Sequence, residues 1–343
     1  MNSNNIPTSS RSTWMDCIKI IATFLIMVNH GVSHVWTSHP IDTFTWKIIH
    51  MFFLMSRIAV PLFFICSGAG MLRKEHSISQ IFIKNIFRLL KIYVAWMLVY
   101  GAIDCISLFP KHLASPRTCI NAFVKSIIFG QYHTWFILTL LSLYLITPFL
   151  FQITRTRESM NYFLILSFIF TILFPWIRSL SIFSRLTETL DNFNMNFVCG
   201  YTLYYVAGHY ICTIPWKKVY SQIAAIIFFI SFGITYVSSM NLSITSNVPY
   251  QDSFMELSPL MTIISLSAFC IFRGLDEQLK SRIIKPLITY GFALYLMHPL
   301  FLQYVQKLSG LYTLCGTVAL YFSCVYICFL ISRSKLLSRL LLR

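Results

Sequence analysis

Long apolar runs recur at nearly regular intervals along the chain. A run of about 17 to 25 mostly apolar residues is long enough to cross the hydrocarbon core of a bilayer as a helix. The segments that meet this criterion are 14–36, 47–71, 87–108, 134–153, 161–180, 194–213, 219–238, 257–273, 286–306 and 310–332. The pattern predicts an all-α integral membrane protein with about ten transmembrane helices in one bundle.

The amino-acid composition agrees with this pattern. Of the 343 residues, 57% are hydrophobic and only 11% are charged, which is more apolar surface than a soluble core buries. One transmembrane domain, 14–332, is expected between two cytoplasmic tails: a disordered, Ser- and Asn-rich tail at 1–13 and a basic tail at 333–343. The matched, Gly/Pro-interrupted spans of an inverted-repeat transporter are not visible in the sequence.

The basic residues are distributed unevenly between the two membrane faces. If the N-terminus is cytoplasmic, 18 of the 27 Lys and Arg residues fall on its face and seven on the other, while Lys19 and Arg57 lie inside spans. The positive-inside rule then predicts that both termini are cytoplasmic and the number of spans is even. Basic loops beside anionic membrane lipids also explain the net charge of +16 without a nucleic-acid partner.

Most of the ten cysteines fall inside apolar spans, where cysteine behaves as a small hydrophobe. No Cys-x-x-Cys pair exists, and no metal site is expected. Cys105 and Cys119 both lie toward the outer side, so a disulfide is possible, but two unpaired thiols are the favoured interpretation. The same outer connection, 109–133, contains an amphipathic stretch, Ile120 to Phe129, that is expected to lie in the membrane interface.

The first span carries three ionisable residues: Asp16, Lys19 and His30. Charged groups inside a span cost several kcal/mol unless they are paired or hydrated, so they favour a functional site. Lys19 and His30 are eleven residues apart, which places them on nearly the same helical face, roughly 16 Å apart along the axis. The imidazole of His30 suits a general base, although an inter-helix hydrogen bond is an equally good explanation for a lone membrane histidine.

Further basic residues lie in the next two spans. Arg57 precedes Pro61 within the second span, where it either extends to the outer interface or lines a hydrated cavity. Lys84, Arg88 and Lys91 lie at spacings of four and three at the cytoplasmic start of the third span. These three cations are typical of a positive-inside anchor, and alternatively of a clamp for cofactor phosphates.

Polar and aromatic side chains gather on the outer side. Gln131, His133 and Trp135 open the fourth span, as expected of an interfacial aromatic belt or of a carbohydrate site in which the indole stacks on a sugar. His298, in the ninth span, is equally ambiguous. The same holds for Glu188 and Asp191 in an outer connection.

Together these motifs resemble the membrane acyltransferase-3 family of bacterial carbohydrate O-acyltransferases, in its membrane-only branch. The resemblance rests on Asp16-x-x-Lys19-x10-His30, on the run from Arg57 to Gly68, on Arg88-x-x-Lys91, on His133-Thr134-Trp135-Phe136, and on Tyr295-Leu296-Met297-His298-Pro299. Two departures are visible. Lys19 and Lys91 stand where the family usually has arginine, so the charge is kept but the bidentate fork is lost.

The resemblance implies a multi-pass enzyme of the bacterial inner membrane that transfers an acyl group, most often acetyl from acetyl-CoA, to a carbohydrate hydroxyl. His30 would act as the base, Arg57 would stabilise the oxyanion and Asp16 would line the entry. Lys19, Lys84, Arg88 and Lys91 would hold the acyl-CoA cosubstrate. Gln131, His133, Trp135 and His298 would bind the acceptor.

Sugars of O-antigen or other lipopolysaccharide, of other envelope polysaccharides and of lipid-linked glycans all fit as the acceptor, and succinyl fits as well as acetyl. Direct transfer and a transient acyl-histidine are both compatible with the residues. A carrier or flippase for a lipid-linked sugar or small metabolite is the main alternative function. Such a carrier would use the same polar face as a permeation path and would need no thioester.

Overall fold

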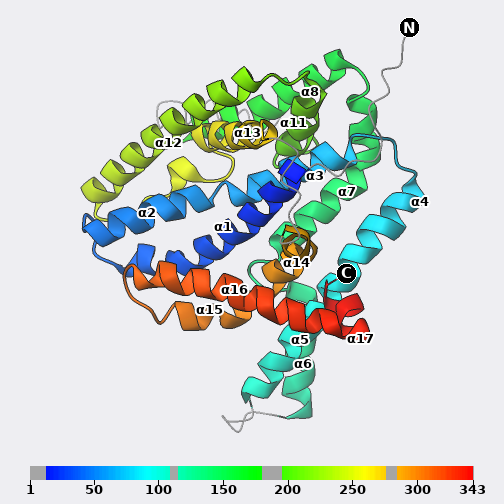
Figure 1. Ribbon diagram of the computed structural model, residues 1–343, viewed down its shortest axis with the longest axis vertical. Helices are drawn as coiled ribbons and strands as arrows, with labels where there is room; N and C mark the ends of the chain where they lie inside the picture. The colour runs from blue at the N-terminus through cyan, green and yellow to red at the C-terminus, as the bar shows by residue number, and fades with distance from the viewer. Residues whose placement is uncertain (1–12, 109–114, 180–194, 276–283, 343) are drawn as a thin grey trace.

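The computed structural model describes residues 13–108, 115–179, 195–275 and 284–342, and all the regular structure in these ranges is helical (Figure 1). The longer helices are α1 (Thr13–Ser38), α2 (Phe44–Ser56), α3 (Ala59–Met71), α5 (Phe87–Leu108), α6 (Pro116–Phe129), α7 (Trp135–Ile153), α8 (Arg157–Phe168), α11 (Thr202–Thr213), α12 (Lys218–Ser246), α13 (Pro259–Arg273), α14 (Ile284–Met297) and α16 (Tyr312–Arg333). Shorter elements include α4 (Ile78–Gln80), the π-helical turn η1 (Ile81–Ile86), the 3-10 turn η5 (Asp252–Phe254), α15 (Pro299–Val305), α17 (Lys335–Leu337) and η6 (Ser338–Leu342). The acidic residues Glu188 and Asp191 lie outside the described ranges.

The predicted all-α membrane class is confirmed, and the number of long apolar helices differs slightly from the ten predicted spans. Eight helical segments within the described ranges are long and apolar enough to cross a membrane. The segment predicted at 194–213 has regular helix only from Thr202 to Thr213. The one predicted at 286–306 is divided at His298, because Pro299 has no N–H to donate to the carbonyl four residues earlier, which belongs to Tyr295.

The second predicted span is also divided, and the break positions a charged side chain. Helix α2 ends at Ser56 and α3 begins at Ala59, so Arg57 and Ile58 lie between two helices. Pro61 has no N–H to donate to the carbonyl four residues earlier, which belongs to Arg57. The missing hydrogen bond explains why the helix breaks at this point.

Glycines bring α3 and α11 into backbone contact. A Cβ atom at Gly68 would collide with the backbone oxygen of Tyr205, and one at Gly208 would collide with the backbone oxygen of Ile65. Small residues at such a crossing let two membrane helices approach closely. Gly70, two residues further along α3, has open space at its Cβ position.

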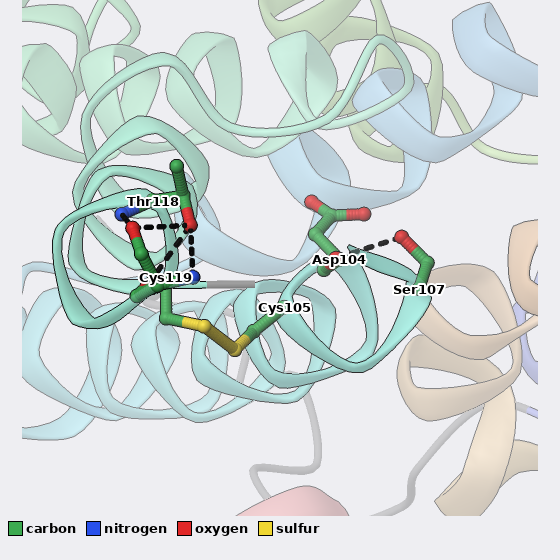
Figure 2. The surroundings of a disulfide bond; sticks show 6 residues. Asp104, Cys105, Ser107, Thr118 and Cys119 are labelled. Carbon is green, nitrogen blue, oxygen red and sulfur yellow. Dashed lines mark hydrogen bonds between the residues drawn. A yellow bond between two sulfur atoms is a disulfide. The ribbon is translucent and has the colours of Figure 1, made fainter. Parts of the chain in front are cut away.

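Helices α5 and α6 form a hairpin that projects from the bundle (Figure 1). A disulfide joins Cys105 of α5 to Cys119 of α6, with their Cα atoms 4.9 Å apart (Figure 2). The favoured interpretation of two unpaired thiols was therefore wrong, because the hairpin brings the two residues within the Cα spacing that a disulfide requires. Disulfides persist in oxidising compartments, and this hairpin end lies on the face that the charge pattern assigns to the outside.

The last residues of the chain pack against the bundle. The turns α17 and η6 follow α16, and the Trp96 indole of α5 donates a hydrogen bond to the carbonyl of Leu341, with 3.1 Å between the heavy atoms. Leu342 is buried. The basic segment that was expected to be a tail is thus helical and attached to α5 as far as residue 342.

Replacing Gly68 by alanine is expected to destabilise the protein by about 1 to 3 kcal/mol, because the added methyl group forces α3 and α11 apart. In the matched variant Gly70→Ala, the added methyl group has no neighbouring atom within 4 Å. This variant is expected to be neutral or to stabilise α3 by up to about 1 kcal/mol. Thermal unfolding of both variants in detergent micelles checks this. Equal melting temperatures for the two variants would show that the crossing does not depend on Gly68.

Candidate active site

Four of the predicted site residues line one cavity of about 100 Å³. These residues are His30 from α1, Arg57 from the break between α2 and α3, and His133 and Trp135 from the start of α7. The other lining residues are Ile26, Asn29, Ser56, Val60, Phe136, Glu256 and Tyr295. This outer cavity therefore combines imidazole, guanidinium, carboxylate and amide groups in a chain whose spans are mostly apolar.

His30 lies among aromatic rings rather than beside a carboxylate. Its imidazole stacks on His298 with 5.3 Å between ring centroids, and it meets the edge of Tyr132 at the same distance. On the neighbouring residue, the Asn29 amide donates to the Ser56 hydroxyl across 2.9 Å. That bond ties the His30 end of α1 to the break beside Arg57.

The other two histidines retain unused hydrogen-bonding atoms. His298 is fully buried, and its Nδ1 lies 2.7 Å from the carbonyl oxygen of Tyr295. A carbonyl can only accept, so Nδ1 carries the proton, and Nε2 keeps its lone pair in the neutral ring. That Nε2 atom and both ring nitrogens of His133 have no partner within the described part of the chain.

His133 is 2% exposed, yet it lines the outer cavity. Burial, and secondarily the nearby His30, lowers the pKa of the His133 imidazole well below its ordinary value. The ring is therefore neutral near pH 7 and can both donate and accept a hydrogen bond. A buried polar group without a partner is costly, so a hydroxyl or water in the cavity is the expected partner.

Arg57 is held by two residues that the sequence analysis missed. Its Nη1 lies 3.1 Å from Glu256 Oε1, and its Nη2 lies 2.8 Å from Gln251 Oε1. The guanidinium also covers the ring of Phe53, 4.6 Å from the centroid, while its buried Nε–H has no partner in the described chain. A signal for Glu256 was available, because an arginine in a span calls for a counter-ion and Glu256 directly precedes the predicted span 257–273.

A second cavity, of about 160 Å³, lies beside the first. Lys19 lines this inner cavity together with Ile20, Thr23, Phe63, Ser67, Phe136, Leu140, Leu287, Ile288, Gly291, Phe292 and Tyr295. The walls are thus mainly apolar, with one cation among them. The two cavities follow each other along α1, with Lys19 at one and His30 at the other.

The remaining predicted site residues are not brought to either cavity. Asp16 is buried near the start of α1 but lines neither of them. Lys84, Arg88 and Lys91 are exposed around the junction of η1 and α5 and contribute to neither lining. Gln131 lies two residues before His133 and is also absent from both linings.

Two comparisons gave no match: no curated protein and no solved structure matched this chain. The third comparison did. The helical bundle, with a polar cavity between its helices, defines a polytopic membrane protein. The sequence matches the model of the acyltransferase-3 family, described as an acyltransferase domain, over residues 12–333. The chain belongs to this family, as its motifs predicted, and is a membrane acyltransferase.

The ion pair at the cavity generates a stability prediction. Arg57 and Glu256 side chains are 15% and 13% exposed, so Glu256→Ala leaves a largely buried cation without its carboxylate. We expect a loss of about 3 kcal/mol in the free energy of unfolding, and partial recovery in the double variant Arg57→Leu/Glu256→Leu. Denaturant unfolding followed by circular dichroism measures both.

The control for this experiment is Glu158→Ala, which removes an exposed carboxylate. It is expected to change the free energy of unfolding by less than about 0.5 kcal/mol. If Glu256→Ala were as stable as this control, the ion pair would contribute nothing to holding the cavity together.

Proposed function

We propose that this acyltransferase moves an acetyl group from acetyl-CoA to a hydroxyl of a cell-surface carbohydrate, with His30 as the general base. The observation that carries the proposal is the shared cavity of His30, Arg57, His133 and Trp135. It supplies a base, a cation for developing negative charge, a polar partner for a hydroxyl and an indole face for a sugar. The protein would then act in the bacterial inner membrane.

In the proposed reaction, a neutral His30 imidazole accepts the proton of the acceptor hydroxyl while its oxygen attacks the thioester carbonyl. The tetrahedral intermediate carries a negative oxygen, which Arg57 stabilises. Collapse breaks the carbon–sulfur bond, and the leaving thiolate takes the proton from His30. Arg57 already donates one N–H from each Nη to Glu256 and Gln251, and its Nε–H, which has no partner in the described chain, is a donor available for this role.

The spacing along α1 supports a donor that enters from the Lys19 side. Lys19 and His30 are eleven residues apart, or about 16 Å on an α-helix. The arm of coenzyme A has about 13 bonds between its diphosphate and its sulfur, which is also roughly 16 Å at extended-chain spacing. Lys19 at the diphosphate would place the thioester close to His30.

The ammonium group of Lys19 favours the same assignment. It has no ion-pair partner within 4 Å in the described part of the chain, although it lines a mainly apolar cavity. Such a cation calls for an anion from a ligand. The exposed Lys84, Arg88 and Lys91 would meet the outlying nucleotide phosphate at the membrane surface, and not inside the cavity.

The acceptor would approach from the opposite end. Tyr132 and Trp135 are 61% and 41% exposed beside the His30 cavity, and these rings can stack on a sugar. Next to them, the two ring nitrogens of His133 are free to bond a sugar hydroxyl. The His298 ring stacks on His30.

We expect His30→Ala to reduce acyl transfer at least about a hundredfold while the protein still folds, because a positioned base contributes that much. His34→Ala is the matched control, since His34 lies one turn further along α1 and is exposed. A deletion strain complemented with either variant is grown, and its envelope glycans are compared by mass spectrometry for the loss of acetyl groups. A folded His30→Ala protein that acetylates like the control would remove the proposed base.

A further inference from the structure

The two cavities meet at two side chains. Phe136 of α7 and Tyr295 of α14 line both the outer cavity of His30 and the inner cavity of Lys19, and no other residue is shared. Their rings meet edge to face with centroids 5.5 Å apart. Each side chain is 5% exposed, and the two rings form a wall that both spaces share.

Several contacts hold this wall in place. Phe136 packs against Phe63 and Phe64 of α3, with ring centroids 5.6 and 4.9 Å away. The Tyr295 hydroxyl donates a hydrogen bond to the backbone carbonyl of His133, which ties α14 to the turn before α7. On the next residue, the carbonyl of Leu296 accepts a hydrogen bond of 2.8 Å from Tyr100 of α5.

The two cavities differ in the number of polar groups that their walls offer to water. The outer cavity is lined by Asn29, His30, Arg57, His133 and Glu256, which offer the polar partners that a water molecule needs. The inner cavity is mainly apolar, so apart from Lys19, Thr23 and Ser67 its walls offer few partners to water. A thioester in the inner cavity would therefore be shielded from the water of the outer one.

This separation matters for the chemistry proposed above. A base that removes a proton from a sugar hydroxyl can equally remove one from water. In hydrolysis the water oxygen attacks the thioester carbonyl, the carbon–sulfur bond breaks, and free acid and the coenzyme thiol are released. The acyl group is then lost without reaching the acceptor.

We propose that Phe136 and Tyr295 determine the selectivity for the acceptor hydroxyl over water. They form a partition that keeps the donor thioester in the mainly apolar inner cavity until the acceptor occupies the outer one. The inference rests on the proposed acyl transfer from coenzyme A. The existence of the partition can be tested without any enzymatic activity.

The first experiment measures the partition itself. Gly291 lines the inner cavity and its Cβ position is open enough for a cysteine, so Gly291→Cys is placed in a background that lacks the eight free cysteines. An anionic, membrane-impermeant methanethiosulfonate is added to intact cells from the outer side. We expect little modification with the partition intact, and at least a tenfold faster reaction when Phe136→Ala is added.

Two controls accompany this measurement. Val60→Cys reports on the outer cavity and is expected to react in both backgrounds. Phe149→Ala removes an exposed ring from the same helix as Phe136 and is expected to leave Gly291→Cys protected. Tyr295→Ala, on the other helix, repeats the test should Phe136→Ala fail to fold. Equal reaction of Gly291→Cys in all backgrounds would overturn the partition.

The second experiment measures selectivity with purified protein in lipid vesicles. Without acceptor, Phe136→Ala and Tyr295→Ala are expected to hydrolyse acetyl-CoA at least tenfold faster than the wild type or Phe149→Ala. If these substitutions make Gly291→Cys accessible but do not increase hydrolysis, the role of Phe136 and Tyr295 in selectivity is overturned. A wild-type protein that transfers no acyl group to envelope glycans would instead refute the proposed function, while the accessibility result would still decide whether the partition exists.

Discussion

The need to neutralise charge inside an apolar bundle governs the organisation of this protein. Arg57 sits at a break between two helices, and the segment before α13 supplies Glu256 and Gln251 to hold it. The Tyr204 hydroxyl in turn donates to the backbone carbonyl of Glu256. The break in the second span and the segment 247–258 are therefore joined through one guanidinium group, and the Tyr204 bond attaches α11 to the same segment. The cavity beside His30 is formed where they meet.

A second consequence of the same constraint is the difference between the two cavities. Arg57 has its counter-ion within the chain, whereas Lys19, about 16 Å along α1 from His30, lines a mainly apolar space without an ion-pair partner in the described residues. In our account, Glu256 neutralises Arg57, whose position stays fixed. Lys19 has no such counter-ion in the described chain, and the phosphates of the donor neutralise it. Phe136 and Tyr295, which lie between them, keep the two environments distinct.

The sequence predicted features that depend on local pattern. Apolar length gave the membrane class, and the motifs around His30, Arg57 and His133 gave the family that the model match confirms. The features it missed depend on distant pairing. Glu256 directly precedes a predicted span, but only the fold places it on Arg57, which is 199 residues away, and only the fold places Tyr295 against Phe136. The preference for free thiols at Cys105 and Cys119 failed for the same reason, since only the hairpin of α5 and α6 brings them together.

The central claim is that donor and acceptor reach one site from opposite faces, with the donor entering on the cytoplasmic side. Membrane vesicles prepared from cells that carry the native acceptor test this most directly. Acetyl-CoA labelled in its acetyl group cannot cross the bilayer, so it is added outside inside-out and right-side-out vesicles, and label in the glycan fraction is counted. The account predicts that only inside-out vesicles incorporate label and that His30→Ala abolishes it. Equal incorporation by right-side-out vesicles would contradict it.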